Sequence, residues 1–315
     1  MSAVLRARGL GKRYRQRWAL ADCDLDVPAG KVVGLVGLNG AGKSTTLNLA
    51  AGMLAPTTGT IEVCGGRPGQ NPAQLAKVGF VAQDTPTYAA LSVADHLALG
   101  ARLNPGWDDA LARDRIHRIG LDPARPAGRL SGGQRAQLAL TLGIAKRPEL
   151  LVLDEPVAAL DPLARREFME DLTVAAQEHA MSVVLSSHLV SDIERVCDHL
   201  IVLVASRVQV AGDIDALLAS HHRLTGPRHE HGGLSAPALP DGSHIVSTTR
   251  TDGRTTLLVR TAGPVDGPVH APAELAVAGW TTGPVPLEDV VLAYMSASRP
   301  ALADRASRPT LESLR

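Results

Sequence analysis

A glycine-rich stretch near the N-terminus has the residue types of a phosphate-binding loop. It reads GLNGAGKST over residues 37–45 and lies between the apolar run 31–36 and a segment compatible with a helix. Glycines let consecutive backbone N–H groups point at an anion, and the N-terminus of the following helix adds positive potential. Lys43 is placed to reach the terminal phosphates and Ser44 to ligate Mg²⁺. The stretch predicts ATP or GTP binding, with a chance glycine-rich turn as the alternative.

Two acids follow another apolar run and supply chemistry that a phosphate cradle lacks. Residues 150–153 read Leu-Leu-Val-Leu, and Asp154 and Glu155 come directly after them. Ligands of open α/β sheets bind at the carboxyl ends of the strands, which is where these acids lie. Asp154 is placed to hold the Mg²⁺ that bridges the phosphates, and Glu155 to orient and polarise the attacking water. Acids at a strand end are often only solvated, but their coincidence with the cradle favours hydrolysis.

A second anion site is predicted at residues 130–134, Leu-Ser-Gly-Gly-Gln, where an apolar-periodic helix begins. Ser131 and the two glycines present N–H groups at that helix N-terminus. One chain then has two phosphate-binding helix N-termini for one nucleotide. A single ATP can use both if they come from different subunits that face each other. The sequence therefore predicts a head-to-tail dimer with two shared sites.

Two further polar residues follow strand-like runs. Gln83 follows residues 78–81, where it could meet the metal or the water, and His188 follows residues 183–187, where its ring could donate to the γ-phosphate. Taken alone, Gln83 reads as an ordinary polar residue after a strand and His188 as a satisfied surface histidine. Tyr14, in a basic run near the N-terminus, could simply cover the core.

In this order and spacing, the motifs of residues 1 to about 220 are similar to those of the ATP-binding subunits of ABC transporters. The resemblance implies that residues 37–45 are the Walker A motif, 130–134 the signature and 150–154 Walker B. It implies catalytic roles for Glu155, the Q-loop Gln83 and the switch His188, and Mg²⁺ binding by Ser44, Gln83 and Asp154. The implied ATP-binding residues, with Tyr14 stacking on adenine and Asp161 in the D-loop, are Tyr14, Gly37, Leu38, Asn39, Gly40, Ala41, Gly42, Lys43, Ser44, Thr45, Ser131, Gly132, Gly133, Gln134 and Asp161.

The chain departs from the family pattern at two positions. Val157 replaces the hydroxyl residue usual after the Walker B Glu-Pro, which removes one local hydrogen bond and no catalytic group. The helix after the signature lacks the arginine common near Thr141 in import cassettes. Residues 103–108, 186–195 and 286–295 are instead similar to bacterial cassettes that serve separate export-type permeases. We therefore expect ATP-driven closure of a dimer, most simply a homodimer, to be coupled to export through a separate membrane permease.

The elements that must position these motifs are those of an α/β P-loop NTPase. Residues 1–30 alternate apolar and polar side chains and predict an N-terminal antiparallel β subdomain, which residues 59–64 extend. Residues 92–147 have a helical pattern and predict a helical insertion. Continuously apolar runs are typical of a mainly parallel core sheet covered on both faces, and they lie at residues 32–36, 150–153, 183–185 and 200–204.

The composition changes near residue 221 and predicts a small C-terminal α+β appendage. We expect a cassette over residues 1–220 with its insertion at about 90–147, a β-rich appendage over 221–298, and a disordered tail over 299–315. An Asp-Gly turn predicts a hairpin in the appendage, and a helix is expected at its end. A histidine cluster invites a metal hypothesis, but its surroundings read as a flexible linker without fixed geometry. Its members are His221, His222, His229 and His231.

Composition bounds the possible partners and location. The 315 residues include 32 basic and 32 acidic side chains, so the global charge does not point to nucleic acid. The three widely separated cysteines read as reduced, buried thiols. No run reaches the roughly 18 apolar residues that span a bilayer, and the N-terminus lacks a signal core. The expected location is cytoplasmic, peripheral at the inner face of the cell membrane through the permease.

Two other functions are compatible with parts of the sequence. A soluble ABC-type ATPase acting on nucleic acid or ribosomes is favoured only by the basic run 12–17, and the chain has neither long coiled coils nor a second cassette. A regulatory binding module is disfavoured by the intact Glu155. A heterodimer of two different cassettes is an alternative to the homodimer. The transported substrate cannot be read, because the residues that touch it would belong to the permease.

Overall fold

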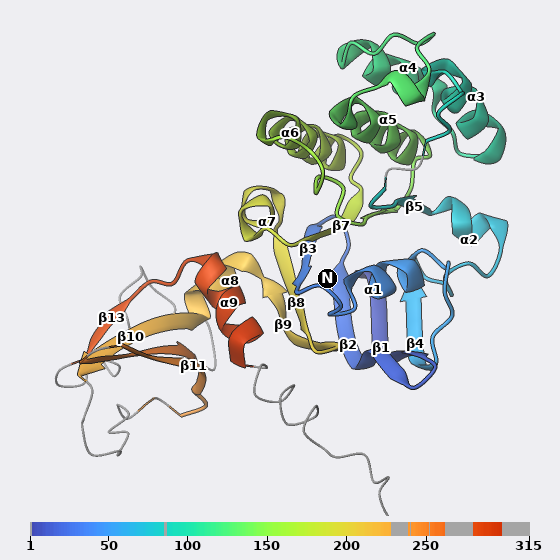
Figure 1. Ribbon diagram of the computed structural model, residues 1–315. Coiled ribbons are helices and arrows are strands. Elements are labelled where there is room, and N and C mark those ends of the chain that lie inside the picture. Colours follow the sequence, from blue (N-terminus) through green and yellow to red (C-terminus); the bar gives the residue numbers. More distant parts are fainter. Residues whose placement is uncertain are drawn as a thin grey trace, which may run out of the picture. The chain divides into compact units, whose positions relative to one another are not determined.

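The computed structural model of the protein describes residues 2–84, 87–227, 239, 241–251, 253–261 and 280–297. The chain divides into two compact units, Met1–Ala211 and Gly212–Arg315. The first unit contains two sheets and the second unit one (Figure 1). Each unit has its own hydrophobic core. The predicted boundary at residue 220 therefore differs from the division after Ala211. Helix α8, Ile214–Ser220, accounts for the difference, because it packs on elements of the second unit.

The first unit is built around a six-stranded sheet in the order β5-β6-β7-β3-β8-β9. Its strands are β3 Val32–Gly37, β5 Val78–Val81, β6 Leu150–Leu153, β7 Ser182–Ser187, β8 His199–Val204 and β9 Arg207–Asp213. The pairs β5 with β6, β6 with β7, β3 with β7 and β3 with β8 are parallel. Strands β3, β6 and β7 are buried along their whole length, as expected of parallel strands covered on both faces. The predicted mainly parallel core sheet is confirmed.

An antiparallel sheet and one helix cover one face of the core sheet. The sheet has the order β2-β1-β4, with β1 Ala3–Tyr14, β2 Arg17–Pro28 and β4 Thr58–Val63, and the helix is α1, Lys43–Ala50. Every second side chain at the end of β2 is buried, which gives this sheet one apolar face. That face, α1 and the core sheet share one hydrophobic cluster. The predicted antiparallel β subdomain is confirmed.

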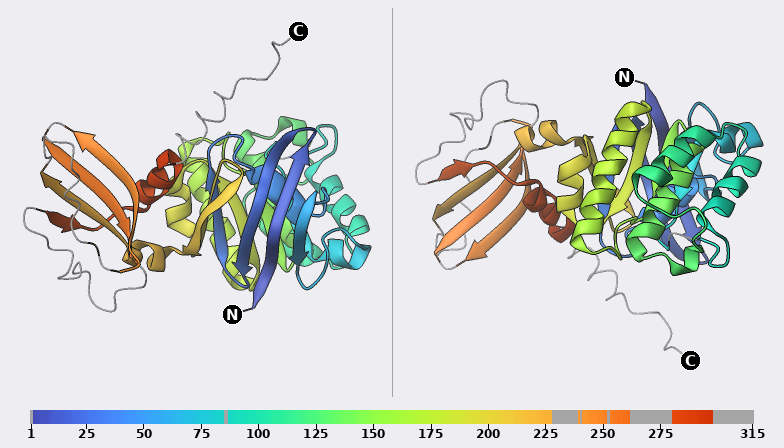
Figure 2. Two further views of the ribbon diagram at one scale, coloured as in Figure 1. Left: turned by 90° about the horizontal axis from the view of Figure 1, so that it is seen from below. Right: turned by 90° about the horizontal axis from the view of Figure 1, so that it is seen from above.

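Helices cover the opposite face of the core sheet and extend beyond it. In Figure 2 the view from below has the blue antiparallel strands in front, and the view from above has the green helices in front. Helix α7, Val190–Val196, packs on β3 and β7, and α6, Pro162–Glu178, packs beside it. The helical insertion has its own core, which includes Trp107, and consists of α3 Val93–Leu103, α4 Asp109–Arg118 and α5 Gly132–Ala145. Among the described residues, no helix has the length and hydropathy needed to cross a membrane.

The second unit contains a four-stranded sheet in the order β11-β12-β10-β13. Its elements, besides α8, are β10 His221–Pro227, β11 His244–Thr251, β12 Arg254–Arg260, β13 Thr281–Gly283 and α9 Leu287–Ala297. Strands β11 and β12 form the predicted antiparallel hairpin, and α9 is the predicted closing helix. The side chain of Leu258 packs with Val290 and Ala293 of α9. The predicted disordered tail lies outside the described residues.

The first two histidines of the predicted linker belong to a strand instead. His221 begins β10 and is only 1% exposed. Its Nδ1 donates to the carbonyl oxygen of Leu217 at 2.6 Å, and its Nε2 lies 3.0 Å from the hydroxyl of Tyr294. Pairing of β10 with β12 overrides the linker-like local composition. Across the described residues no group of three or more His, Cys, Asp or Glu could hold a metal; His229 and His231 lie outside them.

The burial of His221 predicts that the second unit loses stability in mild acid. Burial lowers the pKa of His221 below its ordinary value, although the hydrogen bond to the Leu217 carbonyl opposes this. The unfolded chain therefore binds a proton near pH 6.5 while the folded unit does not. The contribution of His221 to stability is complete above about pH 6.5 and falls below it by up to about 1.4 kcal/mol per pH unit. Burial also lowers the pKa of half-buried His222, which adds to the effect.

Urea unfolding at about pH 7.5 and about pH 5.5 measures this dependence. Trp280 packs in the second unit, so its fluorescence reports this unit once Trp18 and Trp107 are replaced by phenylalanine. His221→Gln is expected to flatten the change in unfolding free energy between the two pH values. His244→Gln, which changes an exposed histidine of β11, is the matched control. An unaltered pH dependence in the His221 variant would contradict the prediction.

The three cysteines are free thiols. Burial raises the pKa of Cys64 to about 12, and it also raises the pKa of Cys23 and of Cys197. The reactive form of a cysteine is its thiolate. All three side chains therefore stay protonated at neutral pH.

Candidate nucleotide-binding site

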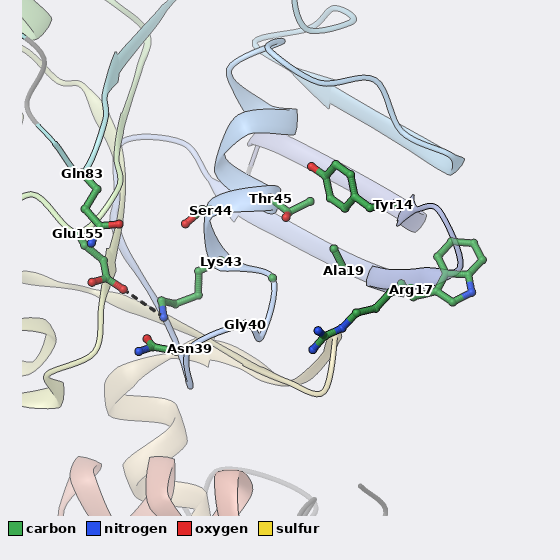
Figure 3. A pocket seen from close by; sticks show the side chains of 12 residues that line it. Tyr14, Arg17, Ala19, Asn39, Gly40, Lys43, Ser44, Thr45, Gln83 and Glu155 are labelled. Carbon is green, nitrogen blue, oxygen red and sulfur yellow. Dashed lines mark ion pairs between the residues drawn. The ribbon is translucent and has the colours of Figure 1, made fainter. Parts of the chain in front are cut away.

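A cavity of about 510 Å³ lies where the glycine loop, the β1–β2 turn and the end of β6 meet (Figure 3). It brings together residues that lie far apart in the sequence, including Tyr14, Lys43, Gln83 and Glu155. Its lining residues are Tyr14, Arg17, Trp18, Ala19, Asn39, Gly40, Gly42, Lys43, Ser44, Thr45, Gln83 and Glu155. The cavity is therefore shared by the predicted phosphate cradle, the aromatic residue and two of the predicted catalytic residues.

The glycine loop has backbone conformations and close approaches that require glycine. Gly40 and Gly42 have φ values of +80° and +109°, which side-chain-bearing residues rarely adopt. A Cβ on Gly42 would lie 2.5 Å from the carbonyl oxygen of Ala19, and one on Gly37 would lie 2.4 Å from that of Leu203. Helix α1 begins directly after Gly42 without a side-chain cap. Its N-terminal N–H groups are thus available to an anion, as in other phosphate-binding loops.

Lys43 is buried at the floor of the cavity, with 5% of its surface exposed. Its Nζ donates to the carbonyl oxygen of Gly37 at 2.8 Å and lies 3.3 Å from Glu155 Oε1. Figure 3 shows the two side chains pointing toward each other across the cavity. The ammonium group therefore has an anionic protein partner, which an incoming phosphate must replace or share.

Glu155 has a second partner and an uncommon backbone. Its Oε2 lies 3.3 Å from Nδ1 of His188, which is itself half exposed. Its φ is +44°, a conformation that costs about 1–3 kcal/mol in residues other than glycine. The backbone N–H of Glu155 donates to the hydroxyl of Ser186 at 2.8 Å. Sequence patterns did not single out Ser186; a hydroxyl residue two positions before His188 is the only local signal for it.

The donor set beside the cradle fits Mg²⁺. Asp154 directly follows β6 and is buried, and its Oδ1 accepts a hydrogen bond from the Ser186 hydroxyl at 2.8 Å. Ser44 and Gln83 line the cavity with a hydroxyl and an amide. Carboxylate, hydroxyl and amide oxygens are ligands that Mg²⁺ prefers, and this ion commonly takes few protein ligands together with phosphates. These three residues are the ones that could hold it.

At one end of the cavity, cations of the basic run 12–17 lie against aromatic rings. Tyr14 is 47% exposed, and Nζ of Lys12 lies 5.5 Å from its ring centroid. Nζ of Lys12 also donates to the carbonyl oxygen of Ala55 at 2.8 Å. The Arg13 guanidinium lies 5.4 Å from the Trp18 ring. Sequence reasoning missed Trp18 and its two neighbours in the lining, although their place in the β1–β2 hairpin beside Tyr14 could have indicated them.

The signature and D-loop residues do not line this cavity in the part of the chain that the structure describes. Ser131 is the exposed N-cap of α5, where its hydroxyl accepts from Gln134 N–H at 3.2 Å and Gln134 Oε1 accepts from Ser131 N–H at 3.0 Å. Asp161 is the N-cap of α6 and accepts from two N–H groups at 3.0 Å. Both motifs are thus helix starts outside the cavity of their own chain.

A P-loop at the carboxyl end of a mainly parallel sheet, with an antiparallel subdomain and a helical insertion, defines an ATP-binding cassette. A family model described as ABC transporter matches residues 20–158. The thiamine import ATP-binding protein ThiQ of Escherichia coli (strain K12) is 35% identical over 202 residues, which are 62% of this chain and 86% of that protein. The chain belongs to the ABC transporter family and is one of its ATP-binding ATPase subunits.

Two solved structures are similar as well. One, the ATP binding subunit of an ABC transporter, is 27% identical over 67% of this chain and 90% of that chain, with a TM-score of 0.61. The other, cbiO1 from Clostridium perfringens, is described as part of the ABC transporter complex cbiONQ. It is 26% identical over 68% and 89% of the two chains, with a TM-score of 0.60. The curated relative above is named for import, so the expectation of export finds no support.

Proposed function

We propose that this chain hydrolyses Mg-ATP to drive a separate membrane permease, working as a homodimer whose two cassettes share two nucleotide sites. The observation that carries the proposal is the division of the phosphate-binding motifs. The cradle and Glu155 line one cavity, whereas the signature is an exposed helix start outside it. A second copy that faces the first would bring the two together. Through the permease, the dimer would lie peripherally at the inner face of the membrane.

The predicted binding residues in and beside the cavity have roles that follow from their places. Tyr14 offers its exposed ring to the adenine, and the loop N–H groups and Lys43 bind the phosphates. Ser44, Gln83 and Asp154 would hold Mg²⁺, which neutralises phosphate charge when bound.

Hydrolysis needs a group that acts on the attacking water. Glu155 orients and polarises this water once the phosphates have drawn Lys43 away from it. His188, 3.3 Å from Glu155, can donate from its ring to the γ-phosphate. The carboxylate and the imidazole thus act from the ends of neighbouring core strands.

The basic run has partners at the nucleotide cavity, which argues against a nucleic-acid role. Lys12 and Arg13 lie against aromatic rings of the hairpin, and Arg17 lines the cavity itself. Salt-sensitive binding of the purified chain to nucleic acid would contradict this reading.

A charge placed at the signature tests the shared site. Aspartate and asparagine both cap helices as well as serine does, so Ser131→Asp and Ser131→Asn keep α5 intact. Only the aspartate puts a negative charge where the γ-phosphate of the facing chain is expected. Ser131→Asp should lower ATPase activity by about 10²-fold, the effect of removing transition-state charge stabilisation. Ser131→Asn should lose far less, and ATP affinity of the isolated chain should be unchanged in both.

Mixing two inactive chains separates a shared site from a site within one chain. Lys43→Ala removes the cradle and Ser131→Asp removes the signature, so each homodimer is inactive. A heterodimer of the two contains one intact cradle facing one intact signature, and an equal mixture should regain roughly a quarter of the wild-type rate. No recovery on mixing, with both chains folded, would argue against the facing dimer.

The permease is tested by isolating the protein from membranes. The full chain, carrying an affinity tag, should copurify with a polytopic membrane protein whose presence raises its ATPase rate. Reconstitution of the pair in vesicles then identifies the direction of transport from the side on which substrate accumulates. Recovery of a ribosomal or nucleic-acid complex instead would contradict the proposed function.

A further inference from the structure

Ser186 joins the two acids of the candidate site through one hydroxyl group. It is the second-last residue of β7 and is fully buried. The hydroxyl donates to Asp154 Oδ1 at 2.8 Å and accepts from the backbone N–H of Glu155 at 2.8 Å. A carboxylate only accepts and an amide N–H only donates, so both bonds form at once with a fixed polarity. The side chain of one residue and the backbone of its neighbour are thus tied to the same atom.

The bond to Glu155 acts on a backbone that needs support. A left-handed φ in a residue with a long side chain persists only where surrounding contacts hold it. The Ser186 hydroxyl accepts a hydrogen bond from the backbone N–H of Glu155. The carbonyl oxygen of Glu155 in turn accepts one from the N–H of Ala158 at 3.2 Å. With its backbone in this conformation, the side chain of Glu155 points toward Lys43, as Figure 3 shows.

The bond to Asp154 acts on the rotation of a carboxylate. Asp154 is buried at the end of β6, next to β7 in the core sheet. With Oδ1 engaged by Ser186, the plane of the carboxylate is fixed and Oδ2 is left to a cation. Hydrogen bonds of this kind orient metal-binding carboxylates and tune their affinity for the ion.

We propose that Ser186 is a positioning residue of the ATPase site and not merely a small side chain that fills the core. Its hydroxyl sets the Asp154 carboxylate for the divalent cation and the Glu155 side chain for the water. Loss of this one group therefore disturbs cation binding and turnover together. The inference rests on the proposed roles of Asp154 and Glu155.

Strand β7 supplies a matched control at its other end. Ser182 is also buried, and its hydroxyl accepts a hydrogen bond from the backbone N–H of Gly30 at 2.9 Å. Ser182 and Ser186 thus each accept from one backbone N–H on a neighbouring segment. Only Ser186 also donates to an acid of the site. A general loss of hydrogen bonding in β7 would affect Ser182→Ala and Ser186→Ala alike.

The test compares Ser186→Thr with Ser186→Val in the full-length chain. Threonine and valine have nearly the same shape, so this pair differs in the hydroxyl alone. Binding of Mn²⁺ in the presence of ADP is measured by electron paramagnetic resonance, which needs no turnover. Binding of ADP in EDTA and the Mg²⁺ dependence of ATPase activity are measured alongside. Ser186→Ala and Ser182→Ala complete the set, and circular dichroism checks that each variant is folded.

We expect Ser186→Val to bind Mn²⁺ about 10- to 100-fold more weakly than Ser186→Thr, the effect typical of lost partners of metal ligands. ATPase activity should fall with it, while ADP binding in EDTA stays within about twofold, because the phosphate cradle is intact. Equal Mn²⁺ affinity in the two variants would overturn the proposal, as would an equal loss in Ser182→Ala. If Ser186→Val does not fold, the Mn²⁺ affinities of Ser186→Ala and Ser182→Ala are compared instead, and equal affinities would again overturn the proposal. A wild-type chain without ATPase activity would refute the proposed function, whereas the Mn²⁺ titration would still decide on Ser186.

Discussion

Glu155→Gln is expected to slow ATP hydrolysis strongly and at the same time to tighten nucleotide binding. Glutamine keeps the shape of the side chain but cannot act on the attacking water as a base, so the rate is expected to fall by about 10²-fold or more. It also removes the negative partner of Lys43, whose Nζ lies 3.3 Å from the carboxylate. Phosphates then bind without displacing an ion pair, and ATP affinity should rise by up to about fivefold. Titration with a fluorescent ATP analogue, beside phosphate release, measures both effects.

An ion pair at the opposite end of the same strand provides the control for this variant. Glu149 precedes β6 and lies 3.3 Å from Nζ of Lys77, the same separation as in the Glu155 pair. Glu149→Gln therefore removes an ion pair of the same length, more exposed and away from the cavity, and should leave ATP affinity and turnover unchanged. Turnover near the wild-type rate in Glu155→Gln would refute the role assigned to Glu155. The tightening of ATP binding tests separately whether the ion pair competes with phosphate.

Lys43→Ala has the largest expected effect on binding. Hydrogen bonds to charged groups contribute about 1.5–3 kcal/mol, which corresponds to a loss of roughly 10- to 100-fold in ATP affinity. The substitution also leaves Glu155 without its cationic partner beside the phosphates, which adds repulsion to the lost attraction. Isothermal titration with ATP in EDTA measures the cradle without the contribution of a cation.

Lys146 is the matched control for Lys43. It is half buried, and its Nζ donates to the carbonyl oxygen of Val78 at 2.8 Å, as Nζ of Lys43 does to Gly37. Lys146 does not line the nucleotide cavity of the described structure. Lys146→Ala should therefore bind ATP like the wild type. ATP affinity within twofold of wild type in Lys43→Ala would mean that the loop is not a phosphate cradle.

The positions of the motifs were predictable because each one is a local pattern. An apolar run, glycines and Lys43 follow one another within a few residues, and so do the apolar run and the acids at Asp154 and Glu155. Parallel strands place their carboxyl ends at one edge of a sheet, which is why motifs far apart in sequence were expected to meet. The structure brings Tyr14, Lys43, Gln83 and Glu155 to one cavity, in line with that rule.

Contacts across the sheet were not predictable in this way. Ser186 is 32 residues from Asp154 and 31 from Glu155 in the sequence, and neither a motif nor a periodicity connects them. The left-handed backbone of Glu155 makes one of these distant contacts through its N–H group. His221 shows the converse. Its local composition is typical of a linker, but pairing with β12 makes its segment the strand β10. Tertiary pairing overrides local propensity in both cases.

The three native thiols, two buried and one partly buried, make the chain suited to site-specific labelling. Thiolates attack maleimide reagents, and the native cysteines are protonated and largely withdrawn from solvent. A single cysteine introduced at Leu163, which is 66% exposed in the first turn of α6, would therefore react far faster than the native ones. Spin labels attached there on two chains would report their separation with and without ATP. The approach of two cassettes could thus be followed in otherwise native protein.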